Sequence, residues 1–315
     1  MKKSCTVFCV ALLFKLIASA PASAGAFAYQ ASGVKTSFQP PRPIIGAFQY
    51  HTIQAGETLL DIARQYELGF NEIVLPHPSL DPWVPKPELT ILIPTRWILP
   101  VSLHEVVVIN IPEMRLYRFF KEIGLVKTYP VGIGREEFET PPAVSRVLDR
   151  KQHPSWTTPP SMWATLGRIV IPPGPENPLG DHWIGLSAAH IGIHGTNNPW
   201  SVGRLVTRGC IRLYPEHIEL FFNEVRVGNT VEIIYEPVKL GVEDGMLFME
   251  VYPDIYTRIP DMYHHAEKLI FQLDHAWDID WIAVYRCIDL QNGVPTVVGA
   301  ASKGGDRLSA AAIQD

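Results

Sequence analysis

A histidine and a cysteine, each next to a glycine, stand sixteen residues apart near the middle of the chain. His194 lies in the stretch Ile191–Thr196 (IGIHGT), and Cys210 lies in the stretch Thr207–Arg212 (TRGCIR). A cysteine beside a histidine can act as a thiolate nucleophile that has its own general base. The thiolate is the reactive form, and a free cysteine is mostly protonated at neutral pH. The pair therefore predicts nucleophilic catalysis, with Cys210 as the nucleophile and His194 as the base that holds its proton.

Two arginines and a glycine surround the cysteine. If residues 207–212 are extended, their side chains alternate, and Arg208, Cys210 and Arg212 share one face. The positive charges would then favour the anionic form of the thiol. Gly209 has no Cβ, so a substrate can approach its backbone and its amide is accessible to an oxyanion.

A metal site is the main alternative for the histidines of this region. His190 and His194 have the four-residue spacing of a metal-binding pair on a helix. Gly192 and Gly195 argue against a helix, so we expect a strand here. On a strand the two histidines would be roughly 13 Å apart, because each residue advances about 3.3 Å, and they could not share one ion. We therefore expect no metal and no cofactor, and we interpret His190 as a structural or groove-lining residue.

The two stretches resemble the signature of the L,D-transpeptidase family, which has a YkuD-type catalytic domain. That signature is His-Gly-Thr followed, after a gap, by Ser/Thr-x-Gly-Cys-Ile/Val-Arg. The position before Gly209 is often histidine in the family and is Arg208 here. The resemblance extends over most of residues 103–237. Three further stretches resemble the same domain: Thr140–Pro142, Ile171–Pro175 and Asn177–Gly180.

The resemblance implies a peptidoglycan L,D-transpeptidase. The Cys210 thiolate would attack the bond between the L-centre of the third stem residue and D-alanine, and form a thioester. The amides of Gly209 and Cys210 would hold the oxyanion, each such donor contributing roughly 3 kcal/mol. His194 would give its proton to the departing D-alanine, and the backbone carbonyl of Gly195 would orient the ring. The expected substrate-binding residues are Arg208, Arg212 and Thr196.

The expected acyl acceptor is an amine, either diaminopimelate of another stem or a lysine of an envelope protein such as a lipoprotein. Two other functions are considered. An L,D-carboxypeptidase would resolve the same thioester with water, and the sequence leaves this alternative open. A wall-binding protein whose catalytic fold is inactive would form no thioester. The intact His194, Cys210 and Arg212 argue against this function. In papain-like and NlpC-type peptidases the nucleophile precedes the histidine, which is the opposite order.

Composition supports a globular, exported protein. The 315 residues are 47% hydrophobic and 19% charged, which is enough for about two domains with proper cores. The net charge of −5 gives no reason to expect a nucleic-acid partner. Residues 1–24 resemble a secretory signal, with a basic start, the apolar run Cys5–Phe14 and a small-residue cleavage site at Ala22–Ala24. The run is too short for a permanent membrane span, so we expect a periplasmic protein.

Cleavage would leave 24 basic and 32 acidic residues, a net charge of −8, and only the cysteines at positions 210 and 287. Exported proteins meet an oxidising compartment, but a bridge between Cys210 and Cys287 would consume the nucleophile. We therefore expect Cys287 to be a buried residue of a strand over Trp281–Ile288.

An N-terminal unit precedes the catalytic stretch. Residues 25–48 are small, polar and proline-rich, and are expected to form a linker. Residues 49–95 then predict a strand over Tyr50–Gln54, a helix capped by Thr58, a short helix near 71–75 and a strand over Leu89–Ile93. This β-α-α-β unit resembles a LysM glycan-binding module. The resemblance rests on these residues: Tyr50, Ala55–Leu59, Ile62–Ala63 and Leu92–Pro94.

The remaining chain predicts a mainly β protein. Residues 103–237 contain β-branched and alternating stretches that indicate an all-β sandwich or barrel, with one helix from Pro215 to near Gly228. Residues 238–299 resemble the C-terminal extension of the periplasmic branch of the family and are expected to be α+β. Their predicted elements are a strand over Leu247–Val251, a helix near Met262–Gln272 and the strand over Trp281–Ile288. Residues 300–315 are expected to be a flexible tail.

Overall fold

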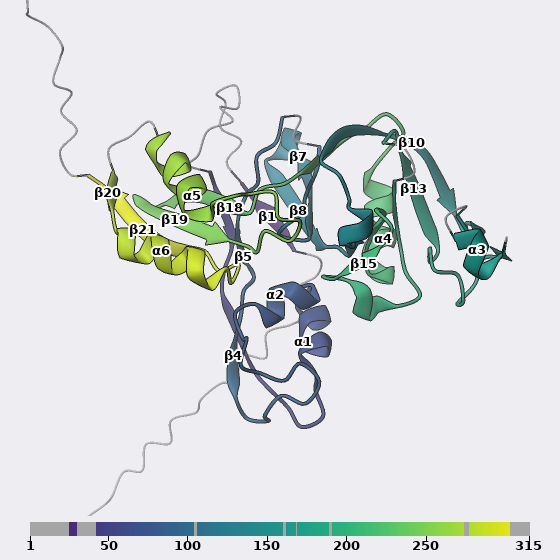
Figure 1. Ribbon diagram of the computed structural model, residues 1–315, viewed down its shortest axis with the longest axis horizontal. Coiled ribbons are helices and arrows are strands. Elements are labelled where there is room, and N and C mark those ends of the chain that lie inside the picture. The colour runs from purple at the N-terminus through teal and green to yellow at the C-terminus, as the bar shows by residue number, and fades with distance from the viewer. Residues whose placement is uncertain are drawn as a thin grey trace, which may run out of the picture.

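The fold is mainly β, as predicted. Figure 1 shows a curled sheet, an N-terminal unit that carries α1 and α2, and a C-terminal unit that carries α5 and α6. The predicted signal segment and most of the predicted tail lie outside the described residues. The computed structural model describes residues 25–29, 42–103, 106–159, 162–167, 169–188, 191–273 and 277–302, with the backbone alone for residue 166.

Nine strands form the main sheet, in the order β1-β8-β7-β6-β17-β10-β13-β14-β16. Neighbours are antiparallel except for the β6–β17 and β14–β16 pairs, which are parallel. The strands are β1 Ala26–Ala28, β6 Val107–Asn110, β7 Arg115–Phe120, β8 Leu125–Pro130, β10 Ala143–Gln152, β13 His182–Leu186, β14 Gly192–His194, β16 Ile211–Arg212 and β17 Thr230–Ile234.

Strand β10 turns this sheet into a barrel-like shape. Its first half pairs with β17 and its second half with β13, with a bulge between Val147 and Asp149. A bulge increases the local twist and bends a strand. The curl brings the last strand back to the far side of the sheet, where Arg212 bridges Gly132, just after β8. The short parallel pair of β9 (Ile133–Gly134) and β15 (Leu205–Thr207) continues this contact.

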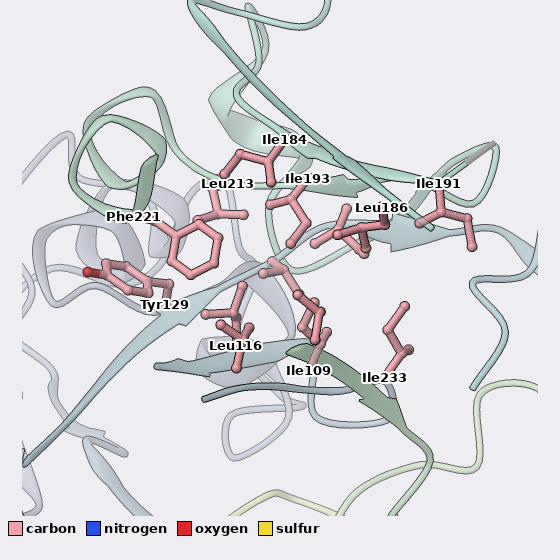
Figure 2. Packing of buried hydrophobic residues seen from close by; sticks show 14 of the residues in the cluster. Ile109, Leu116, Tyr129, Ile184, Leu186, Ile191, Ile193, Leu213, Phe221 and Ile233 are labelled. Carbon is pink, nitrogen blue, oxygen red and sulfur yellow. The ribbon is translucent and has the colours of Figure 1, made fainter. Parts of the chain in front are cut away.

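The alternation of buried side chains in the sheet separates two cores. Val107 and Ile109 of β6 point into the barrel, whereas Val108 points to its outer face. Figure 2 shows the inner cluster, in which Phe221 of α4 (Pro215–Glu224) packs near Ile193 and Leu213. This helix was predicted from its apolar spacing, and it covers the strands that lead into the His–Cys motif.

The N-terminal unit has the predicted β-α-α-β order. Its elements are β3 Gln49–Thr52, α1 Leu59–Gln65, α2 Phe70–Val74 and β4 Thr90–Ile93. Thr58 caps α1 as expected: its hydroxyl accepts from the Asp61 amide at 3.1 Å, and the Asp61 carboxylate accepts from the Thr58 amide. The unit shares the outer core of the main sheet. A fully buried pair between Arg115 of β7 and Glu72 of α2, 2.7 Å apart, fixes it there.

The stretch expected to be a linker contributes two strands. β1 adds to the edge of the main sheet beside β8, and β2 (Ile44–Gly46) pairs with β5 (Arg96–Ile98). Phe27 of β1 lies edge-on against Trp97, with the ring centroids 5.8 Å apart. Residues 25–48 contain too few apolar side chains to fold alone. Their described parts form strands where the edge of another strand or an aromatic side chain is available for contact.

The C-terminal unit is α+β, as predicted, but one element that was predicted to be a strand is a helix. Residues 281–288 belong to a helix, because Asp280 caps it and Val284, Cys287 and Ile288 form a buried stripe at helical spacing, while Ile282 is exposed. The elements are β18 Val238–Glu243, β19 Met246–Val251, α5 Met262–Phe271, β20 Trp277–Ile279, α6 Trp281–Leu290 and β21 Thr296–Ala301. Its sheet order is β18-β19-β21-β20.

One further excursion leaves the sheet between β10 and β13. It contains the short pair of β11 and β12 and one turn of helix, visible at the far right of Figure 1. Its elements are β11 Trp156–Thr157, α3 Trp163–Leu166 and β12 Val170–Ile171.

Candidate active site

The predicted nucleophile and base lie on two adjacent parallel strands at the end of the curled sheet. His194 ends β14, and Cys210 comes immediately before β16. Ile193 faces Ile211 in this pair, which places Cys210 level with Gly192 and two residues short of His194. Strands about 4.8 Å apart that advance about 3.3 Å per residue bring the Cα atoms of such diagonal neighbours within roughly 8 Å. The fold therefore joins the two halves of the sequence motif.

A carbonyl and an indole ring hold the His194 side chain in one orientation. Its Nδ1 lies 2.6 Å from the Gly195 carbonyl oxygen, the contact that the family resemblance implied, so Nδ1 carries a proton and donates it. The ring stacks on Trp183, with centroids 5.9 Å apart and planes inclined by 21°. A Cβ at position 192 would lie 2.2 Å from the same indole, which explains why Gly192 is a glycine. In this tautomer Nε2 is left to accept a proton.

The imidazole is neutral at neutral pH. His194 is only 3% exposed. Burial, together with the positive charge of Arg212, lowers its pKa to about 3, while the carbonyls of Gly195 and Leu179 act in the opposite direction. An unprotonated imidazole is the form that can serve as a general base.

The Cys210 thiol is partly buried and protonated at rest. Burial raises its pKa, and the opposing effects of the Gly192 amide and the Arg212 charge are smaller. The prediction of a thiolate held by two arginines is therefore wrong for the resting site, because desolvation of the sulfur outweighs the charge. The pair rests as a neutral thiol beside a neutral imidazole. Neither Cys210 nor Cys287, the cysteines among the described residues, forms a disulfide.

The strand predicted over residues 207–212 is broken at Gly209. β15 ends at Thr207, β16 begins at Ile211, and Gly209 has a φ of +100°, a conformation that other residues rarely adopt. The Thr207 hydroxyl closes the turn: it donates to the Cys210 carbonyl at 2.6 Å and accepts from the Gly209 amide at 3.2 Å. Side chains on either side of the break therefore do not alternate as in a continuous strand.

The two arginines of the motif have different surroundings as a result. Arg208 is exposed, and its guanidinium lies 4.4 Å from the centre of the Phe138 ring. Arg212 is partly buried opposite His194, and its backbone exchanges hydrogen bonds with Gly132 at 2.8 and 2.9 Å. Among the described residues, the buried Arg212 Nε has no hydrogen-bond partner. Arg212, and not Arg208, is thus the arginine whose charge reaches the reaction centre.

Two of the predicted contact residues are engaged within the protein. The Gly209 amide bonds to Thr207, as described above. Thr196 is buried, and its hydroxyl accepts from the Asn198 amide at 3.0 Å and donates to the Asn198 carbonyl at 3.3 Å. Thr196 therefore holds the turn that follows His194.

Trp183 and Thr140 help to build the site, although the sequence analysis gave neither a role. The Thr140 hydroxyl donates to the Gly209 carbonyl at 3.0 Å and accepts from the Gly134 amide at 2.9 Å. Thr140 stood out only within a stretch that resembles the transpeptidase domain. No local pattern reveals such contacts, because they join residues that are far apart in the chain.

His190 lies outside the described residues, so the structure does not place it. Among the residues that are described, no three His, Cys, Asp or Glu side chains gather as a metal-binding group. Within the same ranges, no helix is long and apolar enough to cross a membrane.

Comparisons with known proteins identify the L,D-transpeptidase family. Residues 104–233 match the model of the L,D-transpeptidase catalytic domain. The probable L,D-transpeptidase YcfS of Escherichia coli is 35% identical over 272 residues, which cover 81% of this chain and 85% of the relative. The probable L,D-transpeptidase YbiS of the same species is 37% identical over 272 residues, covering 80% and 87%. The NMR structure of the Enterococcus faecium L,D-transpeptidase catalytic domain acylated by ertapenem is 16% identical with a TM-score of 0.34, covering 42% of this chain and 99% of that one.

Proposed function

The chain belongs to the L,D-transpeptidase family, and we propose that it is a peptidoglycan L,D-transpeptidase with Cys210 as nucleophile and His194 as general base. One observation carries the proposal. A partly exposed thiol stands on the strand next to an imidazole whose Nδ1 is held by the Gly195 carbonyl. The ring can then take a proton on Nε2 from the sulfur, which is how an adjacent base activates a weak nucleophile.

The acylation step starts from the neutral pair. His194 takes the Cys210 proton as the sulfur attacks the carbonyl carbon between the third stem residue and D-alanine. The C–N bond of the tetrahedral intermediate then breaks, and the His194 imidazolium gives its proton to the departing D-alanine nitrogen. The products are a thioester on Cys210 and free D-alanine, and the imidazole is neutral again. The low pKa of the buried imidazole makes it a strong proton donor in this second half-step.

Backbone amides and Arg212 supply the charge stabilisation. We assign the oxyanion to the amides of Gly209 and Cys210; the Gly209 amide would exchange its bond to Thr207 for one to the oxyanion. Arg212 offers a partly buried guanidinium whose Nε is unpaired within the described residues. A carboxylate of the stem peptide would satisfy it. Arg208 is exposed beside the Phe138 ring and would contact the substrate only at the exposed edge of the site.

The thioester is resolved by an amine. His194 takes the amine proton as the nitrogen attacks the thioester carbonyl, and returns a proton to the leaving sulfur. We propose diaminopimelate of a second stem or a lysine of an envelope protein as the donor of that amine.

We also propose that residues 49–95 bind the glycan strand as a LysM module, and that the protein acts in the periplasm. The support for the module is its β3-α1-α2-β4 order and its capped first helix. The buried pair between Arg115 and Glu72 holds the unit against the sheet that carries the site. A bound glycan strand would therefore be presented to Cys210 at a fixed distance.

Intact-mass spectrometry with a carbapenem tests the nucleophile. The strained β-lactam acylates an activated thiol, so the wild-type protein should gain the mass of one inhibitor molecule. Cys210→Ala should gain none, while Cys287→Ala, which removes the buried thiol of α6, should react like wild type. An adduct that persists in Cys210→Ala would refute the assignment.

Incubation with tetrapeptide muropeptides tests the acceptor. Cross-linked dimers, together with released D-alanine, are the result expected of a transpeptidase. Free tripeptide without dimers would instead identify the L,D-carboxypeptidase.

A further inference from the structure

The C-terminal unit reaches the nucleophile through a chain of hydrogen bonds. Tyr256 lies in the loop between β19 and α5 and is 7% exposed. Its hydroxyl donates to the Gly134 carbonyl at 2.5 Å and accepts from the Thr140 amide at 3.3 Å. The Thr140 hydroxyl in turn accepts from the Gly134 amide and donates to the Gly209 carbonyl. Four hydrogen bonds thus connect residue 256 to the peptide that precedes Cys210.

That last contact determines the direction of one amide. The Gly209 carbonyl and the Cys210 amide belong to the same peptide group, which is planar and trans. A hydrogen bond that holds the carbonyl oxygen therefore also fixes where the Cys210 N–H points. Gly209 has the conformational freedom of a glycine at positive φ, so this peptide group would otherwise turn easily.

The loop that carries Tyr256 is itself held firmly. The Tyr235 hydroxyl donates to Asp254 and accepts from the Tyr256 amide, and the two tyrosine rings stack with centroids 6.0 Å apart. Arg258 pairs with Glu139, the residue before Thr140. The C-terminal unit therefore anchors the segment 134–140 by both a buried hydroxyl and an ion pair.

We infer that Thr140 and Tyr256 are positioning residues that aim the Cys210 amide at the oxyanion, so the C-terminal unit is part of the reaction machinery. This inference rests on the proposed function. An oxyanion forms when a thiol attacks a carbonyl, but not when it is alkylated. Loss of the positioning contacts should therefore slow acylation and leave alkylation unchanged.

The experiment compares two rates in each variant: acylation of Cys210 by a carbapenem and alkylation by iodoacetamide. Complete loss of an oxyanion donor costs about 10²–10³-fold, so we expect misorientation in Thr140→Val to slow acylation about tenfold. Thr140→Ser keeps the hydroxyl and should stay within about twofold of wild type. Tyr256→Phe removes one oxygen and should slow acylation roughly fivefold, whereas Tyr263→Phe, an exposed tyrosine of α5 in the same unit, should have no effect. Alkylation should be equal in all of them, and the loss should fall on the first-order acylation rate constant more than on the apparent affinity for the carbapenem.

Three results would contradict this expectation in different ways. Unchanged acylation in both Thr140→Val and Tyr256→Phe overturns the inference. A parallel fall of acylation and alkylation also overturns it, because the contacts would then only maintain the loop. If the wild-type protein itself shows no acylation at Cys210, the proposed function fails, and the inference fails with it.

Discussion

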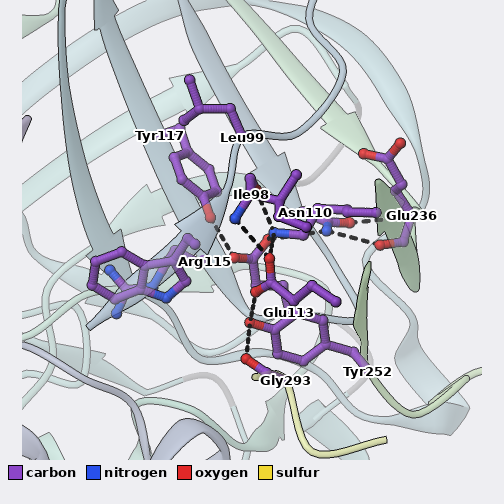
Figure 3. Close-up of polar contacts among 12 residues, drawn as sticks. Ile98, Leu99, Asn110, Glu113, Arg115, Tyr117, Glu236, Tyr252 and Gly293 are labelled. Atoms are coloured by element: carbon purple, nitrogen blue, oxygen red, sulfur yellow. Dashed lines mark hydrogen bonds and ion pairs between the residues drawn. The ribbon is translucent and has the colours of Figure 1, made fainter. Parts of the chain in front are cut away.

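The ionisable groups of two buried polar clusters, the reaction centre and a cluster around Lys239, are accommodated in different ways. At the reaction centre neither His194 nor Cys210 is ionised at rest, because burial disfavours both charged forms. In the second cluster, shown in Figure 3, Lys239 is fully buried between Glu113 at 2.9 Å and Glu250 at 3.1 Å. Burial, together with the charge of Glu113, raises the pKa of Glu250 to about 7, while the charge of Lys239 acts in the opposite direction.

The two clusters also differ in their hydrogen bonds. Lys239 also donates to the Ile98 carbonyl at 2.7 Å, and Glu250 accepts from the Ile98 amide at 2.8 Å and from Tyr252 at 2.6 Å. This cluster joins β5, the turn between β6 and β7, and the C-terminal unit. At the reaction centre the Nδ1 of His194 is held by the Gly195 carbonyl, and its Nε2 can accept a proton. Paired buried charges stabilise the fold, whereas buried groups that can change their protonation state suit catalysis.

The largest difference between the effect on activity and the effect on stability is expected at His194. His194→Gln keeps a neutral side chain but cannot take the thiol proton. Acylation should fall about 10³-fold, within the usual range for loss of a general base, while the free energy of unfolding should change by less than about 1 kcal/mol. Carbapenem acylation rates and denaturant titrations measure the two effects. His217→Gln, at another buried histidine, is the control, and a loss below about tenfold at His194 would argue against its role as base.

At Lys239 we expect a large effect on stability and no effect on activity. Lys239→Met leaves two buried carboxylates without a counter-charge, so the free energy of unfolding should fall by about 3–5 kcal/mol. Acylation by the molecules that remain folded should be unchanged. Lys151→Met, which breaks an exposed pair with Asp149, should cost less than about 1 kcal/mol. Urea titrations of both variants provide the measurement, and equal losses would remove the distinction between the two clusters.

A third prediction concerns the resting protonation state of the thiol. Because burial raises the Cys210 pKa, alkylation by iodoacetamide should climb with pH by roughly 300-fold between about pH 6 and pH 8.5, as the thiolate fraction grows. Acylation should stay nearly constant between about pH 5 and pH 7, because His194 is already neutral there. An alkylation rate that is flat across about pH 5 to pH 7 would instead reveal a preformed thiolate–imidazolium pair.

The smallest effect is a pH dependence of stability that originates in Glu250. Its pKa is about 7 in the folded protein and near 4.5 when unfolded, so the folded state binds the proton more tightly. The stabilisation is present below about pH 4.5 and is lost as the pH rises towards 7. The difference in unfolding free energy between wild type and Glu250→Gln should therefore decline over this interval by about 2–3 kcal/mol. Thermal melts at matched pH would measure it, and a difference that grows with pH would contradict the prediction.

Local patterns were sufficient for several elements of the fold. Thr58 and Pro215 identified the starts of α1 and α4, and β-branched alternation indicated β structure over residues 103–237, including β6. The long strand β10 and its partner β13 were not predicted. The strand prediction for residues 281–288 was wrong because a short apolar run fits a buried strand and a buried helix equally well. Only packing against β19 and β21 shows which side chains point inward. The strands in the expected linker were missed because their partners lie far along the chain.

The amino-acid sequence by itself determined which chemical groups are available: a thiol, an imidazole and a glycine at the turn between them, on strands whose hydrophobic alternation builds a barrel. Side-chain identity and spacing are local properties, so they can be read directly. Only the tertiary structure decided that burial disfavours the charged forms of both groups and that hydrogen bonds link Tyr256, through Thr140, to the peptide before Cys210. Desolvation and hydrogen-bond direction depend on every neighbour in space, and most of those neighbours are remote in the chain.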